Sequence, residues 1–306
     1  MFTRRTFMKL VGGGFVSACA LGSYAFAIEP LARLTTTYYR PDVKGWKGAP
    51  NLRIAALADI HACRPWMSPE RIRYIVEQTN ALKPDLIVLL GDYSTGLNLV
   101  TEQVHSSEWA PVLSELKAPL GVFAILGNHD WWEDKTAQKF RRGPTFGQRA
   151  LEKAGIPVLE NNAVKLEKDG KPFWLTGLGD QLAFPPFRKY GHKRWKTRDN
   201  LAATLDEVSG DDAPAILLAH EPDIFSRVPE RFSVTISGHT HGGQVRVFGY
   251  SPINTSGQKY NYGHVIEGDK HLFVSGGLGC SVLPVRFGSP PEIVLLELRQ
   301  KNNIGV

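Results

Sequence analysis

In the first half of the chain, short apolar segments alternate with segments whose apolar residues recur at helical spacing. Residues 52–58, 85–90 and 121–126 are almost continuously apolar, and helices are predicted between them around 68–82 and 107–116. Strands buried on both faces read as continuous apolar runs, and their alternation with helices is typical of a mainly parallel sheet covered by helices. The alternation therefore predicts an α/β fold with an internal sheet.

The rest of the chain predicts one more helix, over 145–154, and a further set of strands. The predicted strands cover 158–159, 164–166, 173–176, 215–219, 234–237, 245–248, 271–275 and 292–298. Residues 28–50 are punctuated by Pro and Gly and are predicted to be a linker or an irregular wrap. We expect one domain over 51–300, in which 131–211 forms a variable surface that controls access to a site.

Five of the predicted strands end in side chains that can bind metals. These are Asp59 and His61, then Asp92, then Asn128, His129 and Asp130, then His220, and finally His239 and His241. In α/β proteins, ligands bind beyond the carboxyl ends of the strands. We therefore expect these side chains to meet at one edge of the fold.

This set of side chains fits a site for divalent metal ions. Carboxylates and neutral imidazoles without thiolates suit Mn, Fe or Zn. The glycines around His239 and His241 permit a tight loop that turns both imidazoles toward one cavity, which a regular strand forbids. Each residue has a simpler interpretation, because an Asp at a strand end often serves a turn and a lone His is often a core residue. The combination favours the metal site.

The same residues resemble the signature of a known family. The five sequence blocks of the calcineurin-like metallophosphoesterases are similar, in order, to Asp59-x-His61, Gly91-Asp92, Gly127-Asn128-His129-Asp130, His220 and Gly238-His239-x-His241. Residues 218–223 and 242–244 are similar to a bacterial exported phosphodiesterase branch of that family. The sequence after Asp92 is Tyr-Ser-Thr-Gly, without the Val-Asp-Arg-Gly of protein Ser/Thr phosphatases. A phosphoprotein substrate is therefore disfavoured.

The resemblance implies a four-layer αββα sandwich with a dinuclear metal site at the carboxyl ends of its strands. By position, one divalent ion would be held by Asp59, His61 and His241, the other by Asn128, His220 and His239, and Asp92 would bridge them. His129 would stabilise charge on the leaving oxygen or protonate it. Asp130 would orient His129, although a turn acid is an equally good interpretation.

The implied reaction is hydrolysis of a phosphate ester, most naturally a phosphodiester or a pyrophosphate, by a hydroxide bridging the two ions. Exported relatives make an envelope or lipid-linked substrate plausible. Two alternatives stay open: a non-catalytic metal-binding envelope protein of the same fold, and an extracytoplasmic nucleotide phosphodiesterase or nuclease. A nuclease is disfavoured by charge. Residues 1–27 hold three of the 36 basic residues and none of the 30 acidic ones, so the remainder carries only +3, whereas nucleic-acid binding favours a strongly basic surface.

The N-terminus has the pattern of an export signal. Paired arginines in Thr3–Lys9 precede an apolar stretch, and Ala25-Phe26-Ala27 fits a cleavage site. The pattern resembles a twin-arginine (Tat) signal, which implies the Tat export machinery as a partner and a periplasmic or other extracytoplasmic location. A retained membrane anchor, or lipidation at Cys19, stays open, and either would hold the protein at a membrane surface.

A basic and aromatic stretch over 184–198 is the candidate for substrate contact. Lys193 and Arg194 lie there among aromatic side chains, a composition that suits a phosphate-rich or membrane surface. An ordinary solvated loop is the slightly favoured interpretation, because runs of charge usually only face water.

Overall fold

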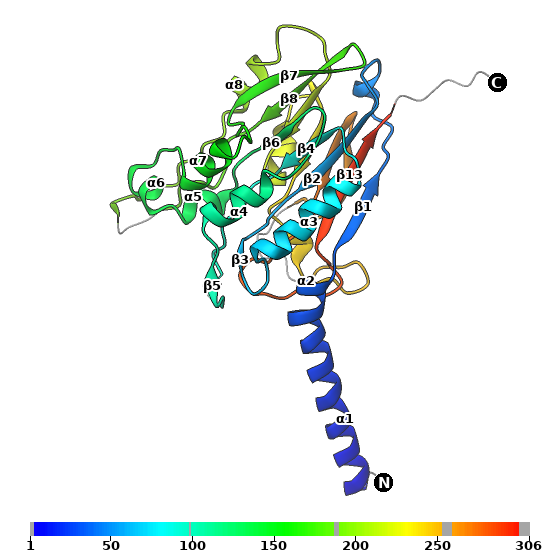
Figure 1. The fold of residues 1–306 in the computed structure, drawn as a ribbon. Coiled ribbons are helices and arrows are strands. Elements are labelled where there is room, and N and C mark those ends of the chain that lie inside the picture. The colour runs from blue at the N-terminus through cyan, green and yellow to red at the C-terminus, as the bar shows by residue number, and fades with distance from the viewer. Residues whose placement is uncertain (1–2, 98, 187–189, 253–258, 300–306) are drawn as a thin grey trace, which may run out of the picture.

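The computed structural model describes residues 3–97, 99–186, 190–252 and 259–299. Two β-sheets pack face to face, and helices cover their outer faces (Figure 1). The predicted α/β class and the four-layer αββα sandwich are both confirmed.

The first sheet contains five strands in the order β1-β13-β2-β4-β6. Their bounds are β1 Thr35–Tyr39, β13 Glu292–Leu298, β2 Leu52–Leu57, β4 Leu86–Leu89 and β6 Val122–Ala124. Strands β2, β4 and β6 run parallel, and β13 lies antiparallel to β2. The carboxyl ends of β2, β4 and β6 therefore meet at one edge of this sheet.

The second sheet contains six strands in the order β11-β12-β10-β9-β8-β7. Their bounds are β7 Asn162–Lys168, β8 Lys171–Gly177, β9 Ala215–Leu218, β10 Phe232–Ser237, β11 Gly263–Glu267 and β12 Lys270–Val274. The central strands β8, β9, β10 and β12 are parallel, so β9 and β10 also end at a common edge. A small third pair joins β3 Cys63–Arg64 to β5 Glu102–Gln103.

Helices fill the outer layers and connect the strands. The helices are α3 Pro69–Ala81, α4 Ser106–Leu113, α5 Asn128–Trp132, α6 Lys135–Phe140, α7 Phe146–Lys153 and α8 Leu201–Asp206, with 3-10 turns η2 Lys44–Trp46, η4 Pro222–Arg227 and η5 His241–Gly243. Helix α3 begins where the sequence predicts, because the Ser68 hydroxyl accepts a hydrogen bond from the Arg71 amide and Pro69 occupies its first turn.

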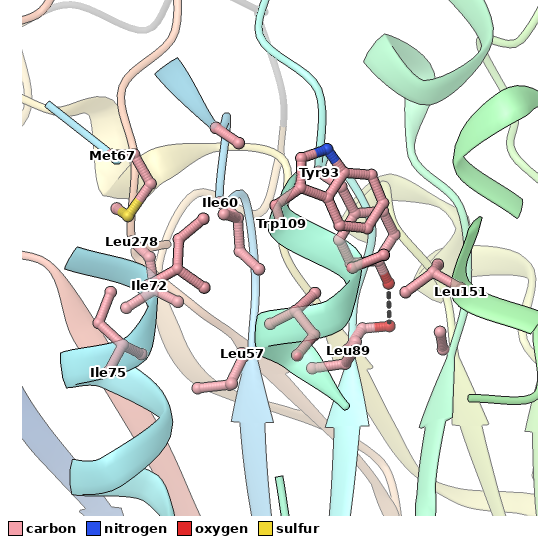
Figure 2. Close-up of a cluster of buried hydrophobic side chains, with 14 of the residues drawn as sticks. Leu57, Ile60, Met67, Ile72, Ile75, Leu89, Tyr93, Trp109, Leu151 and Leu278 are labelled. Atoms are coloured by element: carbon pink, nitrogen blue, oxygen red, sulfur yellow. Dashed lines mark hydrogen bonds between the residues drawn. The ribbon is translucent and has the colours of Figure 1, made fainter. Parts of the chain in front are cut away.

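The core between the first sheet and its helices supports the loop that follows β4. Leu57, Ile72 and Ile75 pack there, and the Tyr93 ring stacks on Trp109 with centroids 5.2 Å apart (Figure 2). The buried Tyr93 hydroxyl donates to the Leu89 carbonyl oxygen at 3.2 Å. The residue next to Asp92 is therefore fixed by both packing and a hydrogen bond.

Three sequence predictions about the fold are wrong. Residues 28–50 are not only a linker, because β1 lies within them and pairs in parallel with β13 at the edge of the first sheet. Residues 245–248 form only isolated bridges, Val245 with Phe287 and Val247 with Tyr250, rather than a strand. Val158 likewise makes one bridge, to Ala124. Strand β11 was not predicted, since Gly263 and the polar residues around it give no apolar run.

A long N-terminal helical segment extends away from the sandwich (Figure 1). It comprises α1 Arg4–Ser23, the π-helical turn η1 Tyr24–Ile28 and α2 Glu29–Ala32. Among the described residues, only this segment is long and apolar enough to cross a membrane, with a mean hydropathy of 1.5 over its most apolar window. An N-terminal signal sequence meets the same criteria, so the helix alone does not distinguish a signal from an anchor.

Candidate metal centre

The structure brings the predicted ligands together where the strands end. Asp59 and His61 follow β2, Asp92 follows β4, and Asn128 opens α5 after β6. The remaining histidines come from the second sheet: His220 follows β9, and His239 and His241 follow β10. Both sheets therefore contribute to one buried cluster, as the parallel strand ends predict.

Three overlapping groups of side chains are compact enough to hold a metal ion. The groups are Asp59, His61 and His241; His61, Asp92 and His129; and Asp92, His220 and His239. Within each group the ligand atoms lie within 4.8 Å of one another. The first and third groups correspond to the two ligand sets that the family resemblance implies, and Asn128 Oδ1 lies 2.8 Å from His239 Nδ1 in the third.

Asp92 lies between the two ligand sets. Its Oδ2 atom is 3.5 Å from His61 Nε2 and 3.3 Å from His220 Nε2. Its Oδ1 atom accepts a hydrogen bond from the His129 backbone amide at 2.8 Å. Burial alone would raise the pKa of this carboxyl, but the imidazoles of His220 and His129 beside it hold the pKa well below its usual range. An ionised carboxylate with an oxygen facing both sets can serve as a bridge.

Three of the four candidate ligand histidines have the neutral form that metal ligation requires. Burial lowers the pKa of His61 to about 3, that of His239 to about 4, and that of His241 well below its usual value. Neutral imidazole is the form that binds metals. Burial would also lower the pKa of His220, but the Asp92 carboxylate outweighs burial and raises that pKa well above its usual value, so an ion bound there would displace a proton.

The Nδ1 atoms of His61 and His220 lie 3.0 Å from Ser94 O and 2.6 Å from Leu90 O. Donation from Nδ1–H to these carbonyls leaves Nε2 as the ring nitrogen of each that faces the cluster.

Two observations show that the cluster fits a cation. His220 Nε2 is buried and has no hydrogen bond of acceptable geometry within the described chain, although it faces the Asp92 carboxylate. Burial also raises the pKa of Asp59 to about 7, so this carboxyl gains from a cation beside it at neutral pH. A divalent ion would accept the His220 lone pair and stabilise the carboxylates together.

Several ligands adopt strained backbone conformations. Asp59, His61, Asp92, His239 and His241 all have positive φ values, between 47° and 70°. Such non-glycine conformations cost about 1–3 kcal/mol each and concentrate at functional sites. The strain turns consecutive strand-end side chains out of the alternating strand pattern and into the cluster. Close packing at the cluster also requires glycine at position 127, because a Cβ atom there would come within 2.6 Å of His220 Nε2.

Asp130 stabilises the loops of the cluster instead of orienting the His129 side chain. Its fully buried carboxylate accepts hydrogen bonds from the backbone amides of Asp92 and Gly127 at 2.9 Å, and from those of Tyr93 and Ser94. None of its hydrogen bonds in the described structure reaches the His129 side chain. The geometry therefore favours the structural interpretation over the predicted orienting role.

Sequence reasoning missed the carboxylate that does lie beside His129. Glu133 Oε1 is 3.4 Å from His129 Nδ1, one helical turn along the chain. Burial would lower the pKa of His129, but the carboxylates of Asp92 and Glu133 outweigh burial and raise it. The His-x-x-x-Glu spacing could have indicated this pair.

A buried arginine was also missed. Arg286 is fully buried, and its guanidinium donates to the carbonyl oxygens of Gly276 and Gly279 at 2.9 Å and of Ser289 at 2.8 Å. Its Nη2 atom is 3.5 Å from His241 Nδ1. No motif in the sequence points to this residue, because its partners are carbonyl groups of glycine-rich turns.

Lys193 and Arg194 are not brought into the cluster. Both side chains are exposed, and the Arg194 carbonyl accepts a hydrogen bond from Arg141. Residues 187–189 of the same basic and aromatic stretch lie outside the described residues. The substrate-binding role of Lys193 and Arg194 stays a prediction.

Comparisons with known proteins show the family of this chain. The family description "Calcineurin-like phosphoesterase" matches residues 52–243, which include every candidate ligand. A Bacillus subtilis protein, "Uncharacterized metallophosphoesterase YkuE", is 31% identical, with 98% of this chain and 99% of that protein covered. The Escherichia coli protein "Phosphodiesterase YaeI" is 30% identical, covering 97% of this chain and all of its own length. An Aquifex aeolicus protein, "Uncharacterized metallophosphoesterase", is 27% identical over 82% of this chain and 87% of its own.

Proposed function

The chain belongs to the calcineurin-like phosphoesterase family and is a hydrolase of phosphoric ester bonds, and on that premise we propose that it is a phosphodiesterase with two divalent ions that acts on an envelope or lipid-linked phosphate ester. The observation that carries the proposal is the position of Asp92. Its carboxylate lies between two complete ligand sets, which is the arrangement a pair of ions requires. Mn, Fe and Zn all suit these nitrogen and oxygen ligands.

Two divalent ions, when bound, would lower the pKa of water and stabilise negative charge on the phosphoryl oxygens. The chain itself would hold the reacting groups in place. Asp59, His61 and His241 would hold one ion, and Asn128, His220 and His239 the other. Asp130 and Arg286 fix the loops that carry these ligands, so little reorganisation is needed when the substrate binds.

His129 is placed to act on the leaving group. The centroid of its ring lies 5.0 Å from that of the His61 ring. Its side chain is less buried than those of His61 and His241. Glu133 lies at its Nδ1 atom, so Nε2 is the ring nitrogen that we assign to the leaving group. We therefore assign to His129 the donation of a proton to the departing alkoxide, with Glu133 as the positioning residue.

A diester substrate is supported by two independent features. The chain lacks the motif that follows the bridging aspartate in protein Ser/Thr phosphatases, and its E. coli relative is named a phosphodiesterase. The N-terminal pattern supports export by a Tat-type route, and we therefore propose that the catalytic domain lies outside the cytoplasm. For that location we propose an envelope phosphate ester as the substrate class.

Hydrolysis of bis(p-nitrophenyl) phosphate and of an alkyl p-nitrophenyl diester tests the proposal. Wild-type protein loaded with Mn²⁺ should hydrolyse both, and it should release alkyl alcohols from dialkyl diesters as well. His129→Ala should lower kcat by on the order of 10²-fold when an alkoxide leaves, but far less when p-nitrophenolate leaves, because p-nitrophenolate needs no proton.

The exposed His105→Ala is the matched control and should behave as wild type. Absence of wild-type hydrolysis with Mn, Fe and Zn would contradict the enzyme proposal. Equal losses for both leaving groups in His129→Ala would instead contradict the proton-donor role.

A further inference from the structure

Two neighbouring loops present large apolar side chains to the solvent. In the loop after η5, the Phe248 side chain is completely exposed and Tyr250 is 73% exposed. In the loop before β13, Val282 is 72% exposed and Leu283 is 46% exposed. Soluble surfaces rarely gather such side chains without a partner.

The two loops are joined into one surface. The Gln244 side chain donates to the Leu283 carbonyl oxygen at 3.2 Å and accepts from the Ser281 amide. The Arg246 amide donates to the Phe287 carbonyl oxygen at 2.7 Å, and Val245 forms a bridge with Phe287. We call Val247, Phe248, Tyr250, Val282 and Leu283 the apolar rim.

The same loops hold the root of the N-terminal helix. The Arg286 amide donates to the Ala25 carbonyl oxygen at 2.9 Å, and the Tyr24 ring meets Phe287 edge to face. Glu29 is fully buried, and its carboxylate accepts from the amides of Gly288 and Ser289 at 3.1 and 2.7 Å. The helix root is therefore part of the folded domain.

We propose that the apolar rim is a membrane-contact surface, that the N-terminal helix stays attached beside it as the anchor, and that the phosphate ester hydrolysed is carried by a lipid in that bilayer. The occupant is a lipid bilayer because the rim is continuous with a helix long and apolar enough to cross one. Arg4, Arg5 and Lys9 lie at the far end of that helix, which favours a cytoplasmic N-terminus and an external domain. Aromatic and aliphatic side chains beside a membrane helix favour the interfacial region.

The two loops that carry the rim also reach the metal centre. His241 precedes Val247 by six residues, and Arg286 contacts both the helix root and His241. In Figure 1, α2 lies at the same end of the domain as β3 and β5, the strands that follow the site loops of β2 and β4. A bilayer at the rim would therefore face the site. This assignment of a lipid substrate rests on the proposed function, whereas the membrane contact does not.

The direct test places a fluorescent probe on the rim of the full-length chain. Phe248→Cys in a Cys19→Ser background, labelled with a polarity-sensitive dye, is reconstituted in vesicles of phosphatidylethanolamine and phosphatidylglycerol. We expect a blue-shifted emission that nitroxide lipids quench. The matched control is Ile266→Cys, because Ile266 is exposed on β11 opposite the start of β12, at the end of the sheet away from the site. Emission from position 248 that is as polar and as weakly quenched as from position 266 would overturn the membrane contact.

A second measurement tests the lipid substrate separately from the membrane contact. In the same vesicles, Phe248→Ser with Val282→Ser should lower hydrolysis of a long-chain lipid diester about tenfold relative to bis(p-nitrophenyl) phosphate, because two exposed apolar side chains that would enter the bilayer are lost. An unchanged ratio would overturn the lipid-substrate assignment. Failure of the wild type to hydrolyse either compound would overturn the proposed function, and the quenching result would still decide the membrane contact.

Discussion

Asp92→Asn is expected to lower kcat for phosphodiester hydrolysis by about three orders of magnitude or more. Loss of charge at this position weakens metal binding by both ligand sets. A bound ion stabilises the transition state by several kcal/mol, and each 1.4 kcal/mol changes the rate constant tenfold. Asparagine keeps the shape of the side chain, and its oxygen can still accept the hydrogen bond from the His129 amide. The loss should therefore appear in kcat and bound metal without a large loss of folding stability.

The measurement is steady-state hydrolysis of bis(p-nitrophenyl) phosphate, with bound metal determined on the same samples. Asp206→Asn, an exposed carboxylate on α8, is the matched control. Activity of Asp92→Asn within tenfold of wild type at equal metal loading would show that Asp92 is not the bridging residue.

Asp130→Ala is expected to destabilise the protein by about 4 kcal/mol. Four backbone amides lose their shared side-chain acceptor, and buried donors left without partners cost about 1–3 kcal/mol each, partly offset by water entering the space. The free energy of unfolding from urea titration, followed by tryptophan fluorescence, measures the effect.

Asp130→Asn and Asp206→Ala make this prediction specific. Asparagine can accept some of the amide hydrogen bonds, so its loss of stability should lie between that of Asp130→Ala and the near-zero loss of Asp206→Ala. If Asp130 acted mainly by orienting His129, Asp130→Asn would instead reproduce the leaving-group dependence of His129→Ala with little change in unfolding free energy.

Much of the fold can be predicted from local patterns. The apolar runs that become β2, β4, β9 and β10 are visible in the sequence because these strands are buried on both faces. Strand β1 is not visible, since Thr35–Tyr39 has no aliphatic residue and pairs with β13 more than 250 residues later. Residues 245–248 show the opposite case, because the sequence predicts a strand there but Val247 and Phe248 belong to the exposed apolar rim.

In the site, too, residues at strand ends could be predicted from local sequence, whereas residues that contact distant parts of the chain could not. Side chains at strand ends could be predicted to meet because parallel strands share an edge, and the structure does bring the predicted ligands together. Arg286 and Glu29 could not be found in this way, because each acts through backbone groups of distant loops, and such contacts follow only from the packed fold. Glu133 lies one helical turn from His129, and its spacing could have indicated the pair.

Titration of the metal-free full-length protein with Mn²⁺ tests the central claim most directly. Bound metal and hydrolysis of bis(p-nitrophenyl) phosphate are measured on the same samples. We predict that hydrolysis appears as the second ion binds and is maximal at two ions for each chain. Metal-free protein that hydrolyses the diester as fast as the loaded protein, or activity that is complete with a single ion bound, would contradict a dinuclear phosphodiesterase.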